Sequence, residues 1–334
     1  MNLTRLGVIV NPRAGDGQGG RAARAAVSAL APAHVLVGAG EMGADVLVGE
    51  APIQVLEWSP RTGVERTRWL ATQMAAQGVD GLLVVGGDGT LADVAWALRE
   101  SASAPALIGL GAGTANVGPL LTCRAAEAAA LRADSLVCED VPGLIAGVNG
   151  RDLGLGFNDV VVDATVLATV DGAMVNVDVA DKLRGLNTPR APIPVHTSQT
   201  EIWRMRNGTK QVVASADQVH TVIVGLPDPR FYGKAIAGGA LLSSMLDEPA
   251  GCLVCDHLLI TVHIDVAAHA ASEPVVSRYA GLAEGDTLHG RGFRAGVALC
   301  ADGNPLQCLQ PADVIHVRAQ RRLARACRLR RADR

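Results

Sequence analysis

The first half of the chain repeats one pattern, in which a short hydrophobic run ends in a turn and a helix-like segment follows. The runs are Leu6–Val10, Gly81–Val85 and Ala106–Leu110. After the second run, apolar residues return at positions 91, 94, 95 and 98, the spacing of one helix face. Repeated units of strand, turn and helix are typical of an open parallel α/β sheet. The pattern therefore predicts a parallel sheet whose strands end at glycine-rich turns.

From about residue 147, apolar and polar positions alternate instead. Strands are indicated at 157–162, 165–170 and 173–179, with Asp171-Gly172 as a hairpin signal, and further alternation occurs at 259–266 and 314–317. The proline-bearing stretch 184–200 predicts a long loop. We predict an α/β fold class with two domains. An open parallel-sheet nucleotide domain spans 1–146, and a β-rich domain of antiparallel strands spans 147–320.

The end of the chain, residues 321–334, is rich in arginine. A charge run of this kind is usually solvated. We therefore expect a basic C-terminal tail that is a solvated helical or frayed end.

Composition narrows the class of function. The 334 residues are 49% hydrophobic and carry a net charge of −3. The chain therefore lacks the overall positive charge that is typical of nucleic-acid-binding proteins. Seven cysteines, an odd number, indicate a reducing compartment and not a disulfide framework. No signal-peptide pattern and no run of roughly 18 apolar residues is present. We expect a cytoplasmic protein without a transmembrane segment that acts on a small molecule or nucleotide.

The segment Gly86-Gly87-Asp88-Gly89-Thr90 is the strongest chemical signal. Glycines let the backbone pass close to a ligand and turn its N–H groups toward an anion, and the helix start that follows favours phosphate. The alternative is a tight strand-to-helix turn capped by Asp88 or Thr90. Two further turns, at 11–15 and 111–116, follow strands of the same predicted sheet, and this edge is where such sheets bind ligands. The pattern favours a phosphate site.

Other familiar chemistries find little support. Asn116 stands where a dinucleotide fingerprint needs its third glycine, and no P-loop motif occurs. The Cys252, Cys255 and His257 group lacks a second pair at zinc-site spacing, so we predict no protein metal centre.

Three motifs together carry a resemblance. Asn11–Gly15, Gly86–Thr90 and Gly113–Asn116 resemble, in order and spacing, the nucleotide-site motifs of the superfamily that joins NAD kinases, diacylglycerol kinases and sphingosine kinases. Phe157–Val160 is similar to the Asn-Asp segment of NAD kinases, and Ala301–Gly303 to their closing Asp-Gly hairpin. A similarity to the acetoin-catabolism AcoX branch is present around residues 113–130. The resemblance implies an NAD-kinase-like fold.

The resemblance also implies roles for single residues. Asp88 would be catalytic, either as the base that takes the acceptor's proton or as a ligand of Mg²⁺ on ATP. Asn158 and Asp159 would bind the acceptor, and the family makes a homo-oligomer an expectation. The nucleotide would be bound by residues of the three turns: Asn11, Gly86, Gly87, Gly89, Thr90, Gly113, Thr114 and Asn116.

One departure from the family leaves the acceptor open. NAD kinases carry a Thr/Ser-rich segment where this chain has Gly225–Tyr232, so phosphoryl transfer is better supported than NAD as its acceptor. The leading hypothesis is an ATP-dependent kinase that phosphorylates a hydroxyl of NAD or a related cofactor-like metabolite. One alternative is a lipid kinase of the diacylglycerol or sphingosine type. Another is a nucleotide-binding regulatory protein without catalysis.

Overall fold

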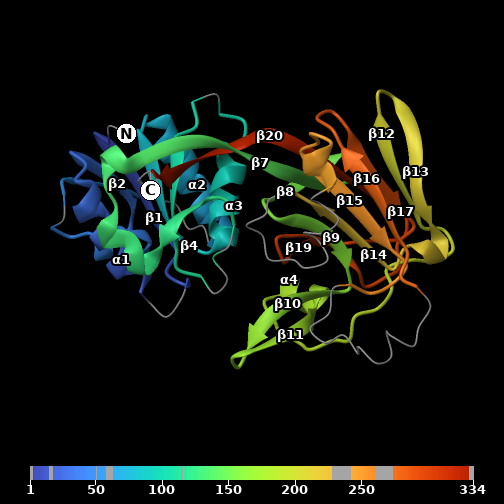
Figure 1. The fold of residues 1–334 in the computed structure, drawn as a ribbon. Helices are drawn as coiled ribbons and strands as arrows, with labels where there is room; N and C mark the ends of the chain where they lie inside the picture. Colours follow the sequence, from blue (N-terminus) through green and yellow to red (C-terminus); the bar gives the residue numbers. More distant parts are fainter. Residues whose placement is uncertain are drawn as a thin grey trace. The chain divides into compact units, whose positions relative to one another are not determined.

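The chain forms two compact units. The computed structural model describes residues 3–14, 18–49, 51–57, 63–101, 103–113, 116, 118–227, 242–259 and 274–330. One unit comprises residues up to 141 together with the segment from 322 onward, and the other comprises 142–321. Strands β7 (Leu136–Val148) and β20 (Val314–Leu329) run from one unit into the other. Figure 1 shows the order of the elements along the chain.

The first unit is built on a parallel sheet. Its strand order is β3-β2-β1-β4-β5, and β6 and the end of β20 also pair with β5. Every one of these pairs is parallel, as the sequence predicted. The strands are β1 (Arg5–Val10), β2 (His34–Gly38), β3 (Ile53–Leu56), β4 (Gly81–Gly86), β5 (Ala106–Gly111) and β6 (Leu121–Arg124).

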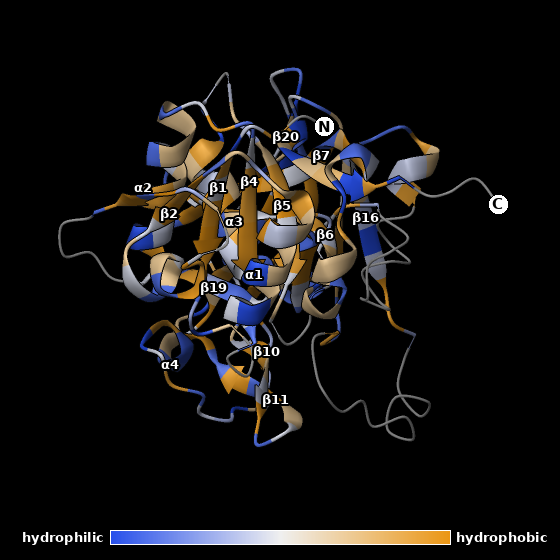
Figure 2. Ribbon diagram, turned by 90° about the vertical axis from the view of Figure 1, so that its left-hand side faces the viewer, coloured by the Kyte–Doolittle hydropathy of each residue, from blue (hydrophilic) through white to orange (hydrophobic). Residues whose placement is uncertain are grey.

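Helices cover both faces of this sheet because its central strands are hydrophobic throughout, as the colouring of β1, β4 and β5 in Figure 2 shows. Helix α1 (Gly19–Leu30) packs on the face that carries Val8 and Val10. On the opposite face, Met74 of α2 (Gly63–Ala76) lies over Gly7, and α3 (Asp88–Leu98) lies over Gly109. Helix α3 contains the predicted periodic positions 91, 94, 95 and 98, all of them buried. Short 3₁₀ turns η1 (Gly40–Met42), η2 (Ala44–Val46), η3 (Ala125–Ala130) and η4 (Ala133–Ser135) complete this unit.

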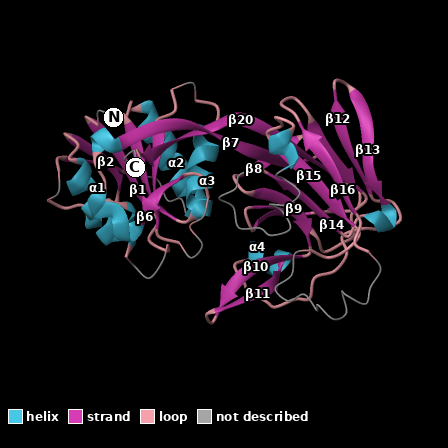
Figure 3. Ribbon diagram, viewed as in Figure 1, coloured by secondary structure: helices cyan, strands magenta, loops and turns pink. Residues whose placement is uncertain are grey.

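The second unit consists almost entirely of strands (Figure 3). All the strand pairs between elements that lie within it are antiparallel, which confirms the prediction. Its elements are β8 (Arg151–Gly156), β9 (Asp159–Asp163), β10 (Thr165–Val170), β11 (Ala173–Asp178), α4 (Val179–Leu183), β12 (Glu201–Arg206), β13 (Thr209–Ser215), η5 (Ala216–Gln218), β14 (Thr221–Gly225), β15 (Ala250–Cys255), β16 (Ser277–Leu282), β17 (Thr287–Arg291), β18 (Ala298–Ala301) and β19 (Asn304–Cys308).

Two layers of strands enclose the core of the second unit. One is a six-stranded sheet of order β16-β15-β14-β9-β18-β19, and the other contains β13-β12-β17 and the first part of β20. Val162 and Val224 from the first layer share a buried cluster with Ile202 and Leu288 from the second. The alternation of side chains along each strand places one apolar face of every strand in this shared core.

The predicted hairpin and loop are both present. Strands β10 and β11 pair antiparallel through a turn in which Asp171 and Gly172 have φ values of 49° and 80°, the left-handed pair of a type I′ turn. Residues 188–200 form no strand or helix, in agreement with the long loop predicted there. The strand predicted at 259–266 lies almost wholly outside the described residues.

The basic tail is a strand up to Leu329 and not the helical or frayed end that was expected. Residues up to Leu329 continue strand β20, in which Ala326 and Cys327 are fully buried and Ala326 lies beside β5. The arginines do not prevent this because their side chains reach acidic partners on β7. Arg322 pairs with Asp140 at 3.3 Å, and Arg328 pairs with Glu139. Charge pairing on one side of the strand therefore accompanies burial on the other.

No helix in the described part of the chain is long and apolar enough to cross a membrane.

Candidate functional site

The segment Gly86–Thr90 forms the turn from strand β4 into helix α3. Gly86 ends the strand, Gly87 precedes the helix with an extended backbone (φ −92°, ψ 179°), and Asp88 is the first helical residue. The N–H groups of Thr90 and Leu91 return to the Gly87 carbonyl at 3.0 and 3.2 Å. The N–H groups before them have no acceptor within the helix. A helix start at the end of a strand therefore presents amide groups suited to a phosphate.

Thr90 packs on Gly86 and holds the first loop in place. A Cβ on Gly86 would lie 2.7 Å from the Cβ of Thr90, so only glycine leaves room for this side chain. The Thr90 hydroxyl accepts a hydrogen bond from Asn11 Nδ2 at 2.8 Å, and Asn11 Oδ1 accepts one from the Arg13 N–H at 3.0 Å. The backbone N–H of Asn11 also donates to the Val85 carbonyl. These bonds tie together the carboxyl ends of β1 and β4.

The loop after β5 lies directly against the Gly86–Thr90 turn. A Cβ on Gly113 would come within 2.7 Å of the Gly87 Cα. Asn116, with a φ of 51°, folds back so that its Oδ1 accepts the Gly113 N–H at 2.8 Å while its Nδ2 donates to the Gly113 carbonyl. Its amide group therefore shapes the loop. Contact between Asn116 and a nucleotide stays a prediction.

Asp88 is held by the same loop. Its Oδ1 accepts a hydrogen bond from the Gly118 N–H at 3.0 Å, and a Cβ on Gly118 would lie only 2.8 Å from this oxygen. A carboxylate here could accept a proton from a hydroxyl or bind a cation. Mg²⁺ usually takes one or two protein carboxylates and fills its other positions with phosphate oxygens and water. The single carboxylate of Asp88, beside a turn whose amide groups suit a phosphate, fits that donor set.

A second polar cluster lies in the other unit, around Asp302 in the turn between β18 and β19. Its carboxylate accepts backbone N–H bonds from Phe157 at 2.7 Å, Asn158 at 2.7 Å and Asp159 at 3.1 Å. Hydrogen bonds to an ionised acceptor are short and strong. Asp302 therefore fixes the start of strand β9 and the position of the two residues predicted to bind the acceptor.

Asp159 and Asn158 have unusual environments. The pKa of Asp159 is raised to about 7 by burial and, secondly, by the negative charge of Asp302. The Oδ1 atom of Asn158 is buried and has no hydrogen-bond partner among the described residues. Buried amide oxygens are normally paired, so this one is an acceptor suited to a hydroxyl or amide of a ligand. A carboxyl that titrates near neutrality beside it can exchange a proton at physiological pH.

The structure brings the predicted residues into two groups. In the first unit, Gly113 and Asn116 lie with the residues of the other two turns: Asn11, Gly86, Gly87, Asp88, Gly89 and Thr90. Asn158 and Asp159 form the second group. Thr114 lies outside the described residues.

Sequence reasoning missed two residues of these groups, Gly118 and Asp302. The Asp-Gly pair at 302–303 signals a hairpin, but nothing local shows that its carboxylate reaches a strand 143–145 residues earlier. Gly118 lies outside all three motifs and carries no signal of its own.

Comparison with known proteins identifies the family. Residues 5–121 match the model of the diacylglycerol kinase catalytic domain. This match contains all three turns of the first unit. Residues 5–121 therefore belong to the diacylglycerol kinase catalytic domain family. An uncharacterised protein of Archaeoglobus fulgidus is 32% identical over 250 residues, which are 72% of this chain and 73% of the relative.

Solved structures share the fold of this chain. A Bacillus anthracis protein assigned to the diacylglycerol kinases has a TM-score of 0.52 at 16% identity, with 98% of each chain covered. Yeast NADH kinase, solved with NADH, has a TM-score of 0.54 at 14% identity, with 99% of this chain and 84% of the yeast chain covered. At these identities the likeness establishes the two-domain fold alone. The resemblance to the AcoX branch stays a prediction.

Proposed function

We propose that this protein transfers the γ-phosphoryl group of ATP to a hydroxyl of NAD or a related cofactor-like metabolite. The observation that carries the proposal is the fixed position of Asp88 at the start of α3, where Gly118 holds its carboxylate beside the glycine turn. Phosphoryl transfer needs positioning and charge neutralisation from the protein more than covalent chemistry. The Gly86–Thr90 turn supplies backbone amide groups that can position phosphate oxygens, and Asp88 supplies a carboxylate that can bind a cation.

Each group has a role in the proposed reaction. The acceptor oxygen attacks the γ-phosphorus, the bond from that phosphorus to the bridging oxygen of ADP breaks, and the hydroxyl proton leaves to a base. Asp88 is either that base or the carboxylate that holds Mg²⁺, which would neutralise phosphate charge when bound. The N–H groups of the Gly86–Thr90 turn would receive phosphate oxygens. We assign recognition of the acceptor's polar groups to Asn158 and Asp159.

The second candidate is a lipid kinase with the same chemistry. The family model that matches residues 5–121 is that of diacylglycerol kinases, and the match includes the segment around Gly113. The unpaired Asn158 oxygen favours a polar acceptor over an apolar one, because a lipid tail could not supply the missing hydrogen bond. We therefore place the cofactor-like acceptor first.

An assay with Mg²⁺ and ATP separates these candidates. The full chain would be incubated with NAD, NADH, a thiamine-type cofactor, small alcohols or a short-chain diacylglycerol, and both ADP release and the mass of the acceptor would be measured. Asp88→Asn should lower turnover by roughly 10²–10⁴-fold if Asp88 is the base. Asp171→Asn is the matched control, since Asp171 is an exposed turn residue whose φ of 49° asparagine also adopts.

The outcomes are distinct. Phosphorylated NAD that is lost in the Asp88 variant alone would support the leading proposal, and a phosphorylated diacylglycerol would move the acceptor to lipids. Saturable ATP binding without turnover on any acceptor would favour a regulatory protein. Full activity of Asp88→Asn would overturn the proposed site.

A further inference from the structure

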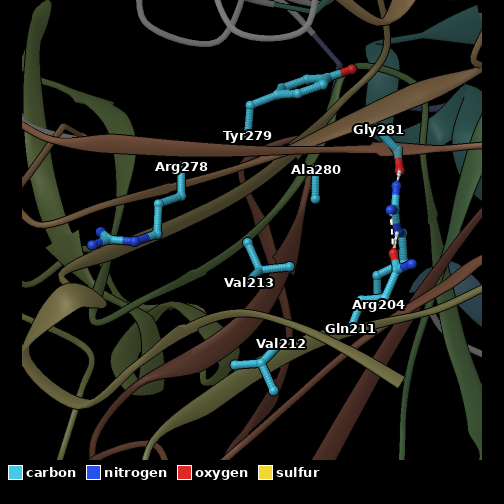
Figure 4. Close-up of a pocket in the computed structure, with 8 residues that line it drawn as sticks. All are labelled: Arg204, Gln211, Val212, Val213, Arg278, Tyr279, Ala280 and Gly281. Carbon is cyan, nitrogen blue, oxygen red and sulfur yellow. Dashed lines mark hydrogen bonds between the residues drawn. The ribbon is translucent and has the colours of Figure 1, made fainter. Parts of the chain in front are cut away.

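A pocket of about 510 Å³ lies within the second unit, between strands β13 and β16. These are the edge strands of its two layers. Figure 4 shows that Arg278 and Arg204 lie toward opposite ends of the pocket, with Val213 and Ala280 between them. The ring of Tyr279 points away on the other side of β16, where its hydroxyl contacts Ser243 at 2.5 Å. The pocket therefore has two cationic ends and an apolar middle.

Neither arginine has an acidic partner among the residues that the structure describes. Arg204 donates to Gln211 Oε1 through Nε at 3.0 Å and to the Gly281 carbonyl through Nη1 at 2.5 Å. Two neutral oxygens therefore hold its guanidinium group in place. Arg278 has a buried Nη1 atom with no hydrogen-bond partner. Buried guanidinium groups are ordinarily paired, because an unsatisfied charged donor loses its hydration without compensation.

The nearby carboxylates are already engaged. Glu248 and Asp286 both pair with Arg206, at 2.7 and 2.5 Å. Glu201 pairs with Lys210 at 2.8 Å and with Arg291 at 3.0 Å. The positive charge of the pocket is therefore not balanced by these acids of the unit, and an anion from outside the chain would balance it.

We propose that this pocket binds a small organic dianion whose two anionic groups are joined by a short apolar spacer. One anionic group would accept the unpaired N–H of Arg278, and the other would lie against the fixed guanidinium of Arg204. Arginine suits carboxylate and phosphate groups because its planar fork matches their oxygens. The spacer would contact Val213 and Ala280. This site is separate from the groups assigned to phosphoryl transfer and does not depend on the proposed kinase activity.

Calorimetric titration of the full chain tests the proposal. Glutarate serves as the dianion, pentanoate as a monoanion with a similar apolar chain, and inorganic phosphate as a compact anion. We expect glutarate to bind at one site, at least about tenfold more tightly than pentanoate or phosphate. Arg278→Gln and Arg204→Gln should each weaken glutarate binding by about tenfold or more, and Arg278→Lys should weaken it less.

Matched variants make the result specific. Arg151→Gln changes an exposed arginine of β8 in the same unit and should leave glutarate binding unchanged. Asp88→Asn should also leave it unchanged, since Asp88 is not among the residues that line the pocket. Circular dichroism and thermal melting would confirm that each variant is folded. Glutarate binding that Arg278→Lys and Arg278→Gln both leave intact, or equal affinity for glutarate and pentanoate, would overturn the proposal.

Discussion

Gly87 and Gly113 face each other backbone to backbone, so that a Cβ atom on Gly113 would lie 2.7 Å from the Cα of Gly87. Backbone atoms on both sides leave no flexible side chain to move aside. The close approach joins the turn after β4 to the loop after β5, although 26 residues separate the two glycines in sequence. The two parts of the proposed phosphate site can therefore meet because neither glycine carries a side chain.

Gly113→Ala should separate these two loops. Overpacking of this kind costs about 1–3 kcal/mol, so we expect a lower melting temperature and weaker ATP binding. Gly19→Ala is the control, because a Cβ there would meet its nearest neighbour at an ordinary 3.6 Å. Calorimetric melting and ATP titration of both variants provide the test. Equal behaviour of the two variants would show that the loops can move apart at no cost.

Thr90→Val should destabilise the first unit by removing one hydroxyl. Valine keeps the shape of the side chain, but Asn11 Nδ2 then loses the acceptor that lies 2.8 Å away. A partly buried donor left unpaired costs about 1–3 kcal/mol. Urea unfolding should show this loss for Thr90→Val and a much smaller one for Thr90→Ser, which retains the hydroxyl. If the serine variant lost as much stability, the methyl group and not the hydrogen bond would be the stabilising part.

Local patterns in the sequence predicted those features that depend on near neighbours. The hydrophobic run at 81–85 indicated a buried strand, and the glycines after it indicated a turn, because both properties follow from adjacent residues. The hairpin at Asp171-Gly172 follows in the same way from the left-handed conformation that these residues tolerate. Parallel pairing of β1, β3 and β4 follows because a helix comes after each of these strands.

Features that depend on distant partners were not predictable. The arginines after residue 321 indicated a solvated end, yet Arg322 finds Asp140 on another strand, 182 residues earlier, and the strand is buried on its other side. Asp302 was visible only as a turn residue, although it fixes the start of β9. In both cases the deciding interaction joins residues that lie far apart in the sequence, so no local pattern could have indicated it.

Asp302→Asn should loosen the start of β9 and lower the pKa of Asp159. Asparagine tolerates the φ of 47° at this position, so the turn itself is retained. Its single side-chain carbonyl cannot replace two carboxylate oxygens that accept three N–H groups, and charged hydrogen bonds of this kind are worth about 1.5–3 kcal/mol each. Denaturant unfolding would measure the loss. Asp171→Asn, the same change in the same kind of turn, should cost little, and an equal cost would contradict the role given to Asp302.

Asp159→Asn should stabilise the protein at neutral pH and have little effect in acid. The pKa of Asp159 rises from an ordinary 3.8 to about 7 in the folded protein, so the fold favours the neutral carboxyl. As the pH rises from 4 toward 7, the unfolded chain ionises first and the wild-type protein loses stability, on the order of 4 kcal/mol once the pH exceeds 7. The asparagine variant does not ionise and should escape this loss. Urea unfolding of both proteins should be measured across this pH range, with Asp134→Asn as an exposed control. We expect the difference in unfolding free energy between Asp159→Asn and the wild-type protein to widen as the pH rises. A constant difference would mean that the Asp159 carboxyl ionises equally easily in the folded and unfolded states.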